Sequence, residues 1–147
     1  MIWFLDTSAL VKRYIRESGS DWLRREIESH QVLIAQITPV ELAAALGRNL
    51  KQGKVSDFAF RQARRRFLLH IKENQYKIEQ MTQPVVNQAM RLAFVYRLRA
   101  YDAVQLATAL MSVNVGERAR MFFVTADGNL ETVAIAEGLQ TLNPSKH

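Results

Sequence analysis

The sequence lacks cysteine, contains only three prolines and six glycines, and has no long apolar run. The absence of cysteine excludes disulfides, zinc sites with thiolate ligands and cysteine nucleophiles. The glycines form neither a phosphate loop nor a dinucleotide-binding pattern. Residues 2–5 are apolar but meet the acidic Asp6, so this start is too short for a signal peptide. We therefore expect a cytoplasmic protein without a membrane segment.

The length and hydrophobic content favour one folded unit. The chain has 147 residues, of which 48% are hydrophobic, enough to bury a core. We expect a single domain over residues 1–147. The three histidines, His30, His70 and His147, lack the spacing of metal ligands, and we expect them at the surface.

Positive charge is concentrated in the middle of the chain. The net charge is +6, and residues 48–77 contain nine Lys or Arg against two acids. Such a patch suits a polyanion such as nucleic acid, although a solvated helix face explains the charge equally well. The candidate RNA-contacting residues are Arg48, Lys51, Arg61, Arg65 and Lys72.

The hydrophobic pattern predicts an α/β fold. Short apolar runs predict buried strands over residues 2–5, 32–35, 121–124 and, more weakly, 139–142. Helical periodicity occupies residues 8–16, 21–28, 39–50, 58–71, 84–96, 102–111 and 130–137. Buried strands alternating with helices predict a short parallel sheet between two helical layers, a three-layer α/β/α sandwich.

Four acids stand where such a sheet would bind a ligand. Asp6 and Asp127 follow two of the predicted strands, and Glu41 and Asp102 open helices. Because ligands of parallel sheets bind beyond the carboxyl ends of the strands, we expect these acids to reach one rim. Each also has a purely structural interpretation. Asp6 and Asp102 suit helix starts, Glu41 could complete a capping box, and Asp127 lies in a turn.

Grouped carboxylates need compensating charge. Two unit charges about 4 Å apart repel by about 4 kcal/mol at an effective dielectric near 20. Oxygen ligands without Cys or paired His favour Mg²⁺ or Mn²⁺ over zinc. Such an ion could hold a phosphate and activate a water molecule.

These motifs resemble those of the PIN-domain family, particularly its VapC-type toxins. The matching segments are FLDTSALVK at residues 4–12, TPVE at 38–41, RAYDAVQLA at 99–107 and VTADGNL at 124–130. The resemblance implies a Mg²⁺- or Mn²⁺-dependent ribonuclease. By this resemblance, Asp6 and Asp102 would be the main metal ligands, and Glu41 and Asp127 would complete the pocket. Thr7, Ser8 and Thr125 would orient these carboxylates. It also implies a homodimer and a cognate antitoxin.

Other interpretations remain open. The chain could be a nucleic-acid-binding module that never cuts, or a PIN nuclease of RNA processing without an antitoxin. A phosphatase of the haloacid dehalogenase type would need a second acid two residues after Asp6, where Ser8 stands. RNA cleavage with added Mg²⁺ or Mn²⁺ separates the nuclease from the binding module.

Overall fold

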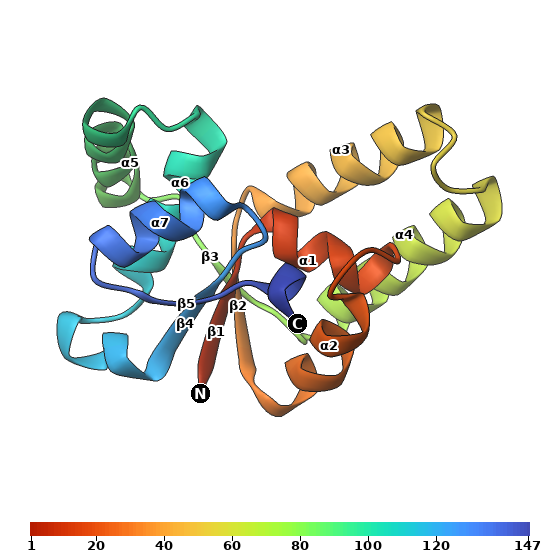
Figure 1. Cartoon of the computed structure of the whole chain (residues 1–147), viewed down its shortest axis with the longest axis horizontal. Coiled ribbons are helices and arrows are strands. Elements are labelled where there is room, and N and C mark those ends of the chain that lie inside the picture. The colour runs from red at the N-terminus through yellow and green to blue at the C-terminus, as the bar shows by residue number, and fades with distance from the viewer.

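The computed structural model describes all residues 1–147 and contains a five-stranded sheet whose strands are all parallel (Figure 1). The strand order is β3-β2-β1-β4-β5. The strands are β1 (Ile2–Leu5), β2 (Gln31–Ala35), β3 (Lys77–Glu79), β4 (Met121–Val124) and β5 (Gln140–Leu142). The α-helices are α1 (Thr7–Tyr14), α2 (Ser20–Glu26), α3 (Thr38–Lys51), α4 (Asp57–Lys72), α5 (Gln83–Tyr96), α6 (Ala100–Ser112) and α7 (Gly128–Ala136).

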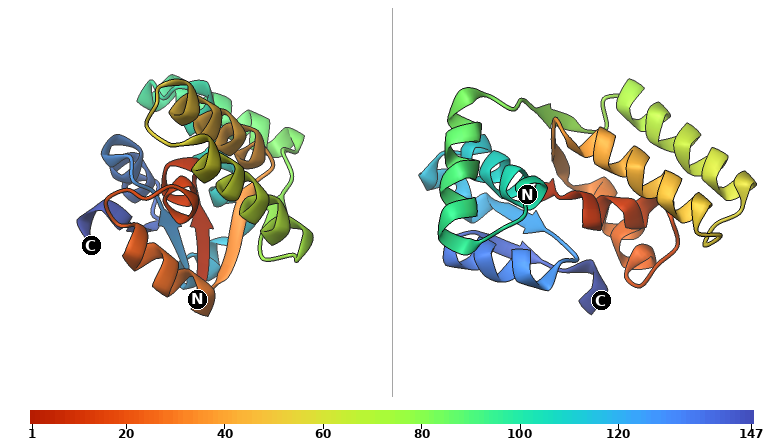
Figure 2. Two further views of the ribbon diagram at one scale, coloured as in Figure 1. Left: turned by 90° about the vertical axis from the view of Figure 1, so that its right-hand side faces the viewer. Right: turned by 90° about the horizontal axis from the view of Figure 1, so that it is seen from above.

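Helices cover both faces of the sheet, which confirms the three-layer α/β/α fold. Helices α1 to α4 lie on one face and α5 to α7 on the other (Figure 2). Successive residues of a strand point to opposite faces, so Phe4 packs in one core while Trp3 and Leu5 pack in the other. This explains why β1 is an uninterrupted apolar run: both of its faces are buried.

The order of the strands creates a crevice between β1 and β4. From β1 the chain moves outward to β2 and β3, and it then crosses back to β4 and moves outward to β5. The connections that follow β1 and β4 therefore leave in opposite directions and open a space at the carboxyl ends of these two neighbouring strands. Asp6 and Thr125 are the first residues beyond these two ends.

Several details differ from the sequence-based expectations. Strand β3 was not predicted, because it has three residues at the edge of the sheet and its single apolar side chain, Ile78, is exposed. The helix predicted over 21–28 ends earlier, at Glu26, and continues as a 3₁₀ turn at Ile27–Ser29. The surface prediction for the histidines was wrong for two of them. His30 stacks on Trp3, and His70 is hydrogen-bonded to the Tyr14 hydroxyl at 2.7 Å, so both are half-buried.

None of the helices combines the length and apolar character that crossing a membrane would require.

Candidate active site

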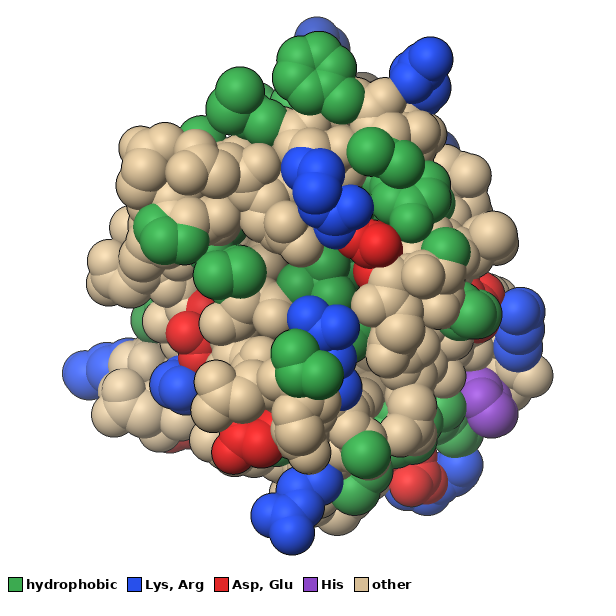
Figure 3. Space-filling model, turned by 90° about the vertical axis from the view of Figure 1, so that its left-hand side faces the viewer, with side chains coloured by type: hydrophobic (Ala, Val, Ile, Leu, Met, Phe, Trp, Pro, Cys, Tyr) green, Lys and Arg blue, Asp and Glu red, His purple; other side chains and the backbone are tan.

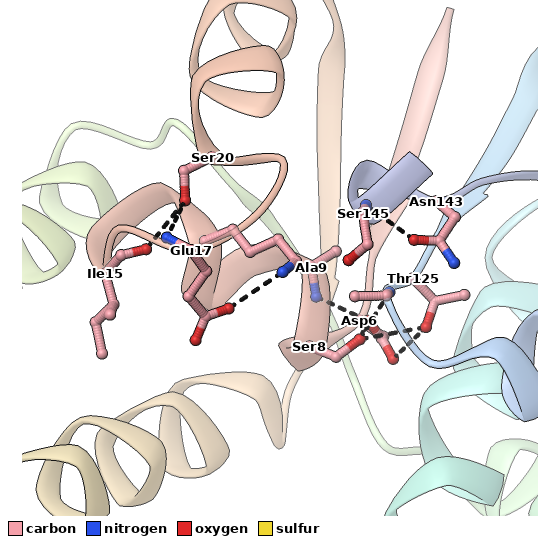
Figure 4. Close-up of polar contacts among 11 residues, drawn as sticks. Asp6, Ser8, Ala9, Ile15, Glu17, Ser20, Thr125, Asn143 and Ser145 are labelled. Atoms are coloured by element: carbon pink, nitrogen blue, oxygen red, sulfur yellow. Dashed lines mark hydrogen bonds and ion pairs between the residues drawn. The ribbon is translucent and has the colours of Figure 1, made fainter. Parts of the chain in front are cut away.

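Asp6 is a buried carboxylate held by three hydrogen bonds at the end of β1. Its side chain is 4% exposed and accepts from the Ser8 hydroxyl at 2.7 Å, the Ala9 N–H at 3.1 Å and the Thr125 hydroxyl at 3.0 Å (Figure 4). Burial raises the pKa of Asp6 to about 7, although these hydrogen bonds act in the opposite direction and the charge of Asp102 adds to the rise. Asp6 therefore caps α1, as its structural interpretation required, and also faces the crevice.

The hydroxyls of Ser8 and Thr125 join the two sides of the crevice. Ser8 Oγ accepts from the Ala126 N–H at 2.9 Å, and Thr125 Oγ1 accepts from the Asp127 N–H at 3.1 Å. Both hydroxyls also donate to Asp6. The turn that carries Asp127 is thus fixed to the turn that carries Asp6, although the two lie far apart in the sequence.

Glu41 is oriented by side chains from two other helices. Its Oε1 accepts from the Thr7 hydroxyl at 3.1 Å and from Gln105 Nε2 at 2.6 Å. The capping-box interpretation of Glu41 is wrong, because α3 is capped by Ile37 without a side-chain bond and Thr38 Oγ1 instead lies 2.9 Å from Gln105 Nε2. Glu41 is consequently directed into the crevice.

Gln105 is a site residue that the sequence analysis did not identify. It is buried, and its Nε2 lies within hydrogen-bonding distance of side chains on α1 and α3. Its Oε1 is buried without a partner. Gln105 follows Asp102 by three residues, so the two share one face of α6. That spacing was the signal available in the sequence.

Asp102 and Asp127 share one arginine. Arg99 Nε lies 3.4 Å from Asp102 Oδ2, and Arg99 Nη2 lies 3.9 Å from Asp127 Oδ2. Burial raises the pKa of Asp102; Arg99 lowers this pKa, whereas the charge of Asp127 raises it further. The Arg99 side chain is 83% exposed, so solvent screens these ion pairs. Arg99 thus serves as a weak internal counter-ion.

All four acids line one pocket of about 400 Å³, which we call the acidic pocket. Its lining residues are Asp6, Thr7, Ser8, Val11, Glu17, Glu41, Ala45, Arg48, Asn49, Arg99, Tyr101, Asp102, Gln105 and Asp127. Asp6 and Glu41 have no basic partner within 4.0 Å. No three acidic or histidine side chains approach closely enough to form a ready metal site. The donors nevertheless suit a hard divalent cation, since they are carboxylates only.

The predicted RNA-contacting residues are not brought together in this pocket. Arg48 lines the acidic pocket. Lys51, Arg61, Arg65 and Lys72 lie outside it. Arg61 is paired with Asp57, one turn earlier on α4. Of these five predicted residues, only Arg48 is thus placed to contact a molecule bound at the acids.

Comparisons with known proteins identify the family and the fold of the chain. The family model described as PIN domain matches residues 3–136. Among solved structures, the chain is similar to PAE2754 from Pyrobaculum aerophilum, with a TM-score of 0.65, 22% identity, and coverage of 96% of this chain and 92% of that one. It is also similar to a toxin-antitoxin complex from Klebsiella pneumoniae, with a TM-score of 0.62, 19% identity and 96% coverage of both chains. VapBC-1 from nontypeable Haemophilus influenzae gives a TM-score of 0.60, 14% identity and 99% coverage of both chains. A search of curated proteins finds no match.

Proposed function

Since the chain belongs to the PIN-domain family, we propose that it is a Mg²⁺- or Mn²⁺-dependent ribonuclease of the VapC type. The observation that carries this proposal is the acidic pocket, in which four carboxylates from β1, α3, α6 and the β4–α7 turn face one space. Asp6 and Asp102 would hold the ion, and Glu41 and Asp127 would complete its surroundings. Such an ion would supply a lowered pKa to a bound water molecule and positive charge to the scissile phosphate.

The remaining polar residues would keep the acids in place. Ser8 and Thr125 orient the Asp6 carboxylate, while Thr7 and Gln105 orient Glu41. These hydrogen bonds orient the Asp6 and Glu41 carboxylates, and the acids would still have to approach one another to share an ion. Arg99, released from the two acids by a divalent cation, would be free to contact a phosphate oxygen.

The test is cleavage of single-stranded RNA by the purified chain. We expect cleavage with Mn²⁺ or Mg²⁺ and none after EDTA is added. The double variant Asp6→Asn/Asp102→Asn should bind RNA without cutting it. A chain that binds RNA but leaves it intact with either ion would instead be a nucleic-acid-binding module.

Arg99→Gln is expected to tighten Mn²⁺ binding by up to about fivefold, because removing an exposed internal counter-ion leaves more negative charge for the ion. Affinity for RNA should fall at the same time, because the neutral side chain no longer pairs with a phosphate. Calorimetric titration with Mn²⁺ measures the first effect directly. Arg120→Gln, an exposed residue at the amino end of β4, is the matched control. Equal Mn²⁺ affinities in the two variants would contradict the counter-ion role.

We further propose a cognate antitoxin and a homodimer. The antitoxin is supported by the similar fold of toxin-antitoxin complexes. A homodimer would cover apolar side chains that are exposed on α5, among them Met90, Phe94 and Val95. Figure 3 views the molecule from this side and shows apolar side chains exposed between basic ones. Sedimentation of the chain alone tests the homodimer, and a monomer would exclude it. Co-purification with a protein encoded beside this chain tests the antitoxin. A neighbouring product that does not bind would favour a nuclease of RNA processing.

A further inference from the structure

A second pocket, distinct from the acidic one, lies between the end of α1 and the α3–α4 hairpin. We call it the arginine pocket, and its volume is about 420 Å³. Its lining residues are Tyr14, Ile15, Arg16, Arg24, Leu46, Lys54, Val55, Ser56, Ala59 and Phe60. Three of these are cationic and none is acidic. The pocket therefore has the charge of an anion site.

The cations of this pocket have few acceptors in the protein. Arg24 donates from Nε to the Arg13 carbonyl at 3.1 Å, and its terminal nitrogens have no acceptor. Lys54 forms no ion pair within 4.0 Å, and Arg16 pairs only with Asp21, where both side chains are more than 70% exposed and the pair is weak. Burial lowers the pKa of Arg24, and repulsion from Arg66 and Arg16 lowers it further. An anion would relieve this repulsion.

The amino end of α4 adds to the positive potential. Ser56, Ala59 and Phe60 line the pocket, and Ser56 caps this 16-residue helix by accepting from the Ala59 N–H at 3.0 Å. A helix amino terminus presents free N–H groups and the positive end of the helix dipole, which favour phosphate. The one carboxylate in this first turn, Asp57, is paired with Arg61.

The pocket also offers an apolar floor. Leu46 is buried, and Val55 and Phe60 are half-buried. A floor of this kind with an aromatic ring suits a nucleobase, because bases stack on aromatic side chains while cations hold the adjacent phosphates.

The two pockets adjoin each other at the turn after α1. Glu17 lines the acidic pocket, and its neighbour Arg16 lines the arginine pocket. This turn is fixed by the buried Ser20, which donates to the Ile15 carbonyl at 3.1 Å and accepts from the Glu17 N–H at 2.8 Å (Figure 4). Helix α1 has eight residues and rises by about 12 Å from the Asp6 side to this turn. A strand must be several nucleotides long to occupy both pockets.

We propose that the arginine pocket binds the phosphate backbone of the RNA strand that extends from the acidic pocket. This inference rests on the proposed function, which places a scissile phosphate beside the four acids. Arg16, Arg24 and Lys54 hold the backbone, and the α4 amino terminus contributes N–H donors. RNA fits better than an acidic peptide, because it supplies both the anions for the rim and the flat bases for the apolar floor.

The test measures binding of a twelve-nucleotide RNA to the Asp102→Asn variant over a range of salt concentrations, so that cleavage does not interfere. Adding Arg24→Gln and Lys54→Gln is expected to weaken binding by about tenfold or more. The slope of the logarithm of the binding constant against the logarithm of the salt concentration should become shallower by about 0.7 for each phosphate that is no longer neutralised. We call this slope the salt slope. The matched control is Arg25→Gln with Lys77→Gln, both exposed and outside the pocket. An unchanged affinity and slope would overturn the proposal.

Two further arms separate the alternatives. A glutamate-rich peptide that displaces the RNA at equal charge concentration would identify an acidic protein as the occupant and overturn the RNA assignment.

In the otherwise unchanged chain, Arg24→Gln/Lys54→Gln should raise the KM for the twelve-nucleotide RNA and leave the cleavage of a trinucleotide unaltered. Equal effects on both lengths would overturn the pocket as a separate site.

Two controls keep failures distinguishable. If the unchanged chain cuts no RNA but the binding difference persists, the proposed ribonuclease activity fails and the arginine pocket stands. If Arg24→Gln disturbs folding, as a thermal melt would show, Lys54→Gln alone tests one cation, because Lys54 is exposed on the α3–α4 connection. An unchanged salt slope for this single variant also overturns the proposal.

Discussion

Asp6→Asn is expected to reduce metal-dependent RNA cleavage by about a thousandfold, equivalent to about 4 kcal/mol of transition-state stabilisation. Asp6 is the most deeply buried of the four acids and lies at the junction of the β1 and β4 ends. An amide in its place retains the shape but removes the negative charge that would hold a cation. Single-turnover cleavage of a labelled RNA with saturating Mn²⁺ measures the effect.

The variant should fold, because the amide can keep the hydrogen bonds of the carboxylate. The Asn oxygen can accept from Ser8 and from the Ala9 N–H, which both bond to the same Asp6 oxygen. The Thr125 hydroxyl, which donates to the other oxygen, can rotate to accept from the amide instead. Glu28→Gln makes the same carboxylate-to-amide change at an exposed position outside both the acidic pocket and the arginine pocket, and it should leave cleavage unaltered. Wild-type cleavage by Asp6→Asn would remove this residue from the catalytic centre.

The sequence was sufficient to predict the strands that are buried on both faces of the sheet. Strands β1, β2 and β4 contain uninterrupted apolar runs, because helices cover each side of the sheet there. Asp6 and Asp127 could be assigned to one rim because the acids follow two of these runs closely. Edge strand β3 has no such pattern, since backbone pairing with β2, and not burial, holds it in the sheet.

The contacts within the site could not be predicted in the same way. The signature at Thr38 and Glu41 fits a capping box, but Gln105 on α6 lies beside the first turn of α3, and both side chains are hydrogen-bonded to it instead. The position of Arg99 between two acids depends on how closely α6 and the β4–α7 turn approach each other. Local sequence patterns do not contain such distances, so the counter-ion role of Arg99 could be identified only from the fold.

The stability of the metal-free chain should fall as the pH rises from about 4 to about 7. The pKa of Asp6 is about 7 in the folded chain and 3.8 in the unfolded chain. The unfolded chain therefore loses this proton at a lower pH, and the free energy of unfolding decreases as the pH rises between these two values. The full difference is on the order of 4 kcal/mol. The pKa of Asp102 is raised in the same direction by burial.

Two histidines act in the opposite direction over part of this range. Burial lowers the pKa of His30 and of His70, so the folded chain gains stability from them as the pH rises through 6.5. Comparison with Asp6→Asn removes their contribution, since both proteins contain them. Urea unfolding of the two proteins with EDTA at pH 5 and pH 8 should therefore show Asp6→Asn gaining stability relative to the unchanged chain. A difference that does not vary with pH would mean that Asp6 is not held in its protonated form.

Added Mn²⁺ should reverse this loss of stability, because a cation bound at the acidic pocket compensates the charge that burial penalises. At a free concentration a hundredfold above its dissociation constant, a ligand that binds only the folded chain adds about 2.7 kcal/mol. The gain should be large at pH 8 and small at pH 5, where protons compete for Asp6. Asp6→Asn should gain little at either pH. An equal gain in stability for the two proteins would mean that Mn²⁺ binds outside the acidic pocket. The four acids would then lie together because of the fold and not because they bind an ion.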